Sequence, residues 1–200
     1  MPKVVDRDER RRRIAGALLR VVARDGIEEV SVRTVAAEAG ISPGAVQKYF
    51  PAKEELLEFA FEMTGEIMVQ RWEAVEPEGS LADVLLQFVH ASLPLDEQAR
   101  AELAIIYAFS ARAATRPHWQ ARIRADYAVA RELTTDLVRR GQDEGVIRTD
   151  VEAEQLTEDV LMMVDGYGPR MLHAESDADR ARLRDSLDLA FDRLVRPPFD

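Results

Sequence analysis

VSVRTVAAEAGISPGAVQKYF, residues 30–50, holds two short apolar periods separated by small residues that include a glycine and a proline. Ser31 precedes the first period, while Ser42 and Pro43 supply an N-cap and a first-turn proline before the second. Gly40 falls where a tight turn requires a positive φ. The stretch therefore predicts two short helices joined as a helix-turn-helix, whose second helix can enter the major groove of DNA.

A helical hairpin with a purely structural role explains the turn about as well. The solvent face of the second helix favours DNA binding, because its residues are small or hydrogen-bonding. They are Gly44, Ala45, Gln47 and Lys48. No acidic residue occurs from position 39 to position 52, although the whole chain carries a net charge of −10.

The charge is divided unevenly along the chain. Residues 1–53 contain 11 Lys and Arg against 7 Asp and Glu, whereas residues 54–200 contain 16 against 30. All three lysines, Lys3, Lys48 and Lys53, lie in the first part. Residues 1–53 thus form a basic segment, called the basic head below, and residues 54–200 are acidic. This asymmetry indicates that the N-terminal part of the chain binds an anion.

Apolar residues recur at spacings of three and four outside this stretch, which predicts further helices. The helix before it ends at Gly26. Later helices are expected at residues 52–72, 81–92, 97–114, 117–144, 151–173 and 177–195. Since no strand pattern is present, the sequence predicts an all-α fold of about nine helices.

Several function classes are disfavoured by what the sequence lacks. It has no cysteine and no apolar run of the roughly 18 to 20 residues that span a membrane. Its N-terminal residues are charged, whereas a secretory signal has an apolar segment there. We therefore expect a cytoplasmic protein without a membrane partner. The histidines His90, His118 and His173 form no metal-binding spacing, and no nucleophile or phosphate-loop motif is present. We expect no enzyme activity, no metal and no cofactor.

Apolar side chains of the middle helices can line a small-molecule cavity, or they can simply form core. The candidates are Phe59, Met63, Ile67, Phe88, Ile106, Phe109, Trp119, Ile123, Tyr127 and Met163.

The helix expected at 151–173 is apolar nearly all round, which indicates burial on more than one side. With the last helix it can form a four-helix interface between two subunits, or it can pack inside a single chain. The interface candidates are Met162, Gly166, Leu183, Leu187, Ala190 and Leu194.

The segment from RRRIAGALLRVVARDG through YFPAKEELLEFAFE resembles the N-terminal domain of the tetracycline-repressor (TetR) family of transcriptional regulators. VRTVAAEAGIS, the aromatic pair Tyr49-Phe50 and Lys53 carry the resemblance. MMVDGYGPRML resembles the Asp-Gly step in the penultimate helix of a betaine-regulator-like branch. The resemblance implies a helix-turn-helix domain over residues 1–53 and a helical effector-binding and dimerisation domain over residues 54–200.

The same resemblance implies roles for single residues. Arg33 reaches a base edge or a phosphate, and Ala45, Gln47 and Lys48 face the groove. The residues that hold the DNA backbone are Thr34, Ser42, Tyr49 and Lys53. The family commonly has a tyrosine where this chain has Gln47, so Gln47 either pairs with adenine N6 and N7 or has no base partner.

We therefore expect a repressor that binds a palindromic operator as a homodimer. A small apolar or amphipathic effector, not identified by the sequence, then releases it. One alternative is a helix-turn-helix regulator controlled by a protein partner without any small ligand. The other is an all-α small-molecule-binding protein whose basic head is incidental.

Overall fold

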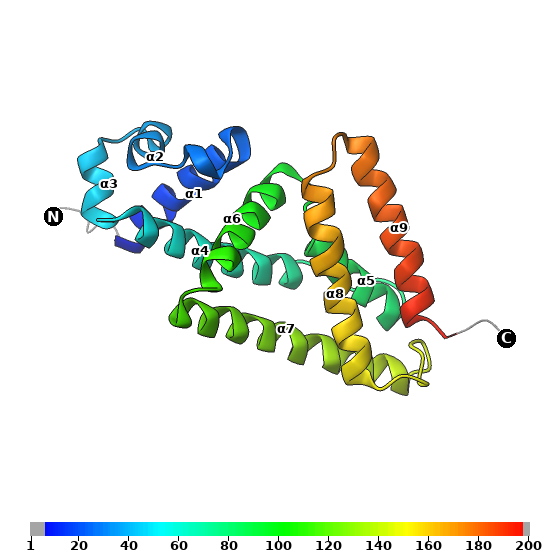
Figure 1. The fold of residues 1–200 in the computed structure, drawn as a ribbon. Helices are drawn as coiled ribbons and strands as arrows, with labels where there is room; N and C mark the ends of the chain where they lie inside the picture. The colour runs from blue at the N-terminus through cyan, green and yellow to red at the C-terminus, as the bar shows by residue number, and fades with distance from the viewer. Residues whose placement is uncertain (1–6, 198–200) are drawn as a thin grey trace. The chain divides into compact units, whose positions relative to one another are not determined.

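The computed structural model describes residues 7–197, apart from the side chains of Arg112 and His118. Lys3, part of the predicted basic head, lies outside the described residues. Residues 7–197 form nine α-helices and one short 3-10 helix, with no strand among them, which confirms the all-α prediction (Figure 1).

The helices are α1 (Arg7–Asp25), η1 (Ile27–Glu29), α2 (Val32–Ala39), α3 (Pro43–Tyr49), α4 (Lys53–Glu73), α5 (Leu81–Ala91), α6 (Glu97–Ala113), α7 (Pro117–Asp143), α8 (Ala153–Leu172) and α9 (Asp177–Val195). Four of them begin at a serine whose hydroxyl accepts a backbone N–H of the first turn, namely Ser31, Ser42, Ser80 and Ser176. These caps satisfy amide groups that a helix cannot pair internally, so local sequence defines these helix starts.

The chain packs as two compact units. Of the described residues, the first unit contains 7–67 and 96–119, and the second contains 68–95 and 120–197. Helices α4 and α7 each contribute residues to both units. This division describes packing, and the functional boundary between residues 53 and 54 remains a prediction.

Helix α1 organises the first unit. It buries an apolar face that includes Ile14, Leu18 and Val21, and it contacts both α2 and α6. Helix α2 in turn contacts α3, with Val35 and Val46 fully buried. Helix α6 therefore belongs to the same compact unit as the helix-turn-helix. Because α6 contacts α1, a displacement of α6 changes the packing of α1.

In the second unit, α9 contacts both α8 and α5. Its core includes Leu85 from α5, Leu156 from α8 and both Leu187 and Phe191 from α9. Burial of each such side chain contributes roughly 1.5 to 3 kcal/mol, so this cluster is the main source of stability for the unit. Within residues 7–197, no helix is both long and apolar enough to cross a membrane.

Candidate functional site: a nucleic-acid interface and an effector region

The turn between α2 and α3 has the geometry that the sequence predicts. Gly40 ends α2 in the left-handed region, with φ 67°, and its N–H donates to the carbonyl oxygens of Ala36 and Ala37. The N–H of Ile41 also donates to Ala36 O, at 3.0 Å. The Ser42 hydroxyl then accepts the N–H of Ala45 and starts α3. Gly40, Ile41 and Ser42 thus form the turn, and the N–H groups of Gly40 and Ile41 are paired with carbonyls of α2.

Helix α3 exposes the face that the sequence assigns to DNA. Ser42, Gly44, Gln47 and Lys48 are exposed, and Ala45 and Tyr49 are half-buried. Arg33 at the start of α2 is exposed and Lys53 at the start of α4 is half-buried. The Ser42 hydroxyl uses its oxygen for the cap and keeps its proton for an outside acceptor such as a phosphate.

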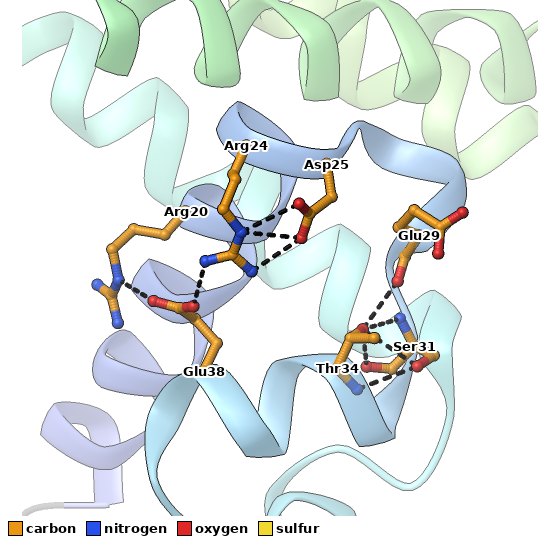
Figure 2. A network of polar contacts seen from close by, with 7 residues as sticks. All are labelled: Arg20, Arg24, Asp25, Glu29, Ser31, Thr34 and Glu38. Atoms are coloured by element: carbon orange, nitrogen blue, oxygen red, sulfur yellow. Dashed lines mark hydrogen bonds and ion pairs between the residues drawn. The ribbon is translucent and has the colours of Figure 1, made fainter.

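The N-terminus of α2 is fixed by a network around Thr34 (Figure 2). The Thr34 N–H donates to the Ser31 hydroxyl at 3.1 Å, and the Ser31 N–H donates to the Thr34 hydroxyl oxygen at 2.9 Å. The Thr34 hydroxyl donates to Glu29 O at 2.8 Å. This capping box ties α2 to η1. The Thr34 hydroxyl donates its single proton to Glu29 O, so the predicted hydrogen bond from this hydroxyl to a DNA phosphate requires it to release Glu29 O.

The C-terminal half of α2 is fixed to α1 through Glu38 (Figure 2). Arg20 Nε donates to one Glu38 oxygen at 2.7 Å, and Arg24 Nη1 donates to the other at 2.8 Å. Hydrogen bonds from Arg20 and then Arg24 hold the pKa of Glu38 below its ordinary value. Glu38 is the acidic residue just before the gap from 39 to 52, and the two arginines cancel its repulsion of a phosphate.

The arginine run at the start of α1 serves two purposes. The Arg11 guanidinium lies 4.1 Å from the ring centroid of Phe59 and 5.1 Å from that of Phe50. Because Phe50 ends α3, these contacts place the first turns of α1 beside the C-terminal end of the recognition helix. Arg12 forms an ion pair with Glu66, whereas Arg13 is exposed. Arg11 is therefore a packing residue, and Arg13 remains available to an outside anion.

Comparisons with known proteins match this geometry. The family model of bacterial regulatory proteins of the tetR family matches residues 14–60, and that of the BetI-type transcriptional repressor C-terminal domain matches residues 81–196. The chain belongs to the TetR family of transcriptional regulators. Members of this family bind DNA and small-molecule effectors, usually as dimers.

Two relatives and one further structure extend the match. The regulator PksA of Bacillus subtilis is 32% identical over an alignment of 187 residues, which covers 90% of this chain and 85% of PksA. The crystal structure of a transcriptional regulator from Rhodococcus sp. Rha1 is 32% identical, with a TM-score of 0.77 over 92% of this chain and 95% of that one. A protein from Saccharomonospora viridis in complex with choline has a TM-score of 0.84 and 23% identity, over 96% of this chain and 100% of that one. The last comparison shows the fold alone.

The predicted effector residues of this TetR-family chain fall into both compact units. Phe59, Met63, Ile67, Ile106, Phe109 and Trp119 belong to the first, and Phe88, Ile123, Tyr127 and Met163 belong to the second. Phe59 lies beneath Arg11, its ring centroid 5.5 Å from that of Phe50, and so it packs with the DNA-binding helices.

Phe109 and Trp119 are brought together in a stack of three rings. The Phe109 centroid lies 3.9 Å from that of Phe61 and 4.1 Å from that of Trp119, with the planes nearly parallel. A void of about 10 Å³ adjoins Phe109 and Trp119. It holds about one water molecule, so an effector must displace a side chain to enter here. Phe61 was not among the residues predicted from the sequence, which were Phe59, Met63 and Ile67, spaced by four along another face of α4.

Tyr127 joins α7 to α8 in the second unit. Its hydroxyl donates to a carboxylate oxygen of Asp165 at 2.9 Å. Burial raises the pKa of Asp165, and the hydrogen bond from Tyr127 opposes that rise. Burial thus makes the charged form of Asp165 less favourable in the folded chain, and the Tyr127 hydrogen bond offsets part of that cost.

The predicted dimer residues differ in exposure. Met162 is 55% exposed and Gly166 is exposed, as an interface requires. Leu187 is fully buried in the core of its own chain, so it supports the subunit rather than touching a partner. Leu183, Ala190 and Leu194 are half-buried. Leu189 on α9, which the sequence prediction did not include, is 53% exposed.

Proposed function

We propose that this protein is a homodimeric repressor that binds a palindromic operator through α3 and is released by a small amphipathic effector, without catalysing a reaction. The observation that carries the proposal is the exposed face of α3, which has no acidic residue. The preceding helix, α2, is fixed at its start by the Thr34 network and at its end by Arg20 and Arg24, which also neutralise Glu38. Membership of the TetR family supports it.

On this proposal, specificity and affinity come from different side chains. Gln47, exposed in the middle of α3, reads a base edge in the major groove, where a glutamine can pair with adenine N6 and N7. Lys53, Arg33, Tyr49 and Ser42 hold phosphates and set the register of the helix on the duplex. Lys48 lies beside Gln47 and contributes positive charge to the same face.

The dimer forms through α8 and α9, with Met162 and Leu189 as apolar contacts. A two-fold dimer presents two α3 helices to half-sites one helical turn of DNA apart, which accounts for a palindromic operator.

Release follows from the packing of the first unit. Helix α6 contacts α1, and α1 contacts α2, so an effector that displaces α6 reorients the recognition helix. An effector needs a differential affinity of a few kcal/mol for the released shape to empty the operator.

The proposal is tested with a fluorescently labelled DNA fragment from upstream of the protein's own gene. We expect binding by fluorescence anisotropy that survives a large excess of unrelated DNA, with two subunits per site. Equal binding to both DNAs would contradict the proposal and favour a basic head without an operator.

A further inference from the structure

The stack of Phe61, Phe109 and Trp119 lies in the same compact unit as the DNA-binding helices. Phe61 comes from α4 and Phe109 from α6, the helix that contacts α1. Trp119 comes from the first turn of α7, just after the turn that follows α6. A displacement of one of these rings therefore acts on α6, which contacts α1, and this effect requires no change in the second compact unit.

A positively charged side chain, that of Arg116, covers one face of the Trp119 indole. The Arg116 guanidinium lies over the indole, 4.9 Å from its centroid. Because Phe109 already covers one face of the indole at 4.1 Å, Arg116 must cover the other. In the described part of the chain, no carboxylate pairs with the half-buried Arg116. The indole is thus held between an aromatic ring and a cation that lacks a counterion.

Trp119 is the ring of the stack that can move most easily. It is 3% exposed, yet it lies in the first turn of its helix, where few backbone hydrogen bonds must break. It is also the end ring of the stack, so its displacement breaks the contact with Phe109 and leaves the contact between Phe61 and Phe109 in place. Phe61 and Phe109 lie further inside their helices and are more firmly held.

We infer that the effector is an aromatic carboxylate whose flat ring replaces the Trp119 indole against Phe109 and whose carboxylate pairs with Arg116. This inference rests on the proposed function, because it names the effector class of the same regulator. The ring recovers the stacking and the cation–π contact that Trp119 gives up. The carboxylate supplies the missing counterion. The first turn of α7 moves with Trp119, and the end of α6 follows.

The test uses Trp72→Phe protein, so that all tryptophan emission comes from Trp119. The probe is 3-phenylpropionate, compared with 3-cyclohexylpropionate, which lacks the aromatic ring, with 3-phenylpropylammonium, which reverses the charge, and with choline. We expect the probe alone to raise the melting temperature, to shift Trp119 emission to longer wavelength as the indole enters water, and to release labelled DNA.

Two further variants separate the roles of the residues. Arg116→Gln is expected to weaken probe binding about 10-fold or more, since a charge-assisted pair is lost. Trp119→Ala is expected to tighten it, because the indole no longer competes for the site. The melting curve of each ligand-free variant checks folding, and Arg116→Gln decides the matter if Trp119→Ala fails to fold.

Stronger binding of the ammonium compound, the cyclohexyl compound or choline would overturn the inference, and so would probe binding without a change in Trp119 emission. DNA binding that no probe relieves would overturn it and leave the proposed operator binding intact. Absence of DNA binding by the ligand-free protein would instead contradict the proposed function.

Discussion

Replacing Lys53 with glutamine tests whether the start of α4 touches DNA. Lys53 is half-buried at the first position of α4, and among the described residues no carboxylate pairs with it. Each phosphate contact contributes about 0.9 to the slope of log affinity against log salt, so two subunits together contribute about 1.8. Between about 50 and 200 mM salt, the wild type should therefore lose about 12-fold more affinity than Lys53→Gln.

Arg20→Gln is the matched control, since it removes the same charge from the same unit. Arg20 pairs with Glu38 at 2.7 Å, so its charge is largely cancelled within the chain. Its salt slope should stay close to that of the wild type. Fluorescence anisotropy titrations at four or more salt concentrations measure the three slopes. An equal decrease of the salt slope in both variants, or an unchanged salt slope in Lys53→Gln, would refute the reasoning.

Three further outcomes are expected. Gly40→Ala should lower the free energy of unfolding by about 1 kcal/mol, because alanine is strained at the φ of 67° that Gly40 adopts, and Gly40→Asn should cost less; denaturant titration compares them. Met162→Asp should convert the dimer to a folded monomer by light scattering, whereas Leu187→Ala should cost roughly 2 to 5 kcal/mol of stability, since that side chain is fully buried. Asp165→Asn should raise the melting temperature at pH 7, and the gain should vanish as the pH falls below the ordinary aspartate pKa. The folded pKa of Asp165 is raised, so the wild type loses stability as the pH rises through it.

The local elements of the fold could be predicted because their ends are encoded in single residues. Ser42 caps α3 as predicted, Ser31 directly precedes α2 and caps it, and Gly40 has the expected positive φ. Helix α9 has the predicted bounds. Helix α8 begins at Ala153 rather than at residue 151, because Glu152 is the last extended residue before it. Capping is local chemistry, and the sequence displays it directly.

Which helix faces meet could not be predicted in the same way. The periodicity of α9 gives one apolar stripe correctly, yet it does not tell whether Leu187 packs inside its own chain or against a partner subunit. The stack of Phe61, Phe109 and Trp119 joins three distant segments, and no spacing in the sequence indicates it. The pairing of Glu38 with Arg20 and Arg24 is also a product of helix packing. Contacts between helices depend on the whole fold, whereas the apolar periodicity of a helix indicates only which of its faces is buried.

The central claim is that α3 is the surface that binds DNA, and a pair of charge reversals tests it most directly. Lys48 is exposed on α3, and Arg140 is exposed near the end of α7 in the other compact unit. Lys48→Glu and Arg140→Glu change the net charge of the protein equally. Anisotropy with labelled upstream DNA at one salt concentration should show binding lost in Lys48→Glu and retained in Arg140→Glu. Equal losses in the two variants, or full binding by Lys48→Glu, would contradict the account.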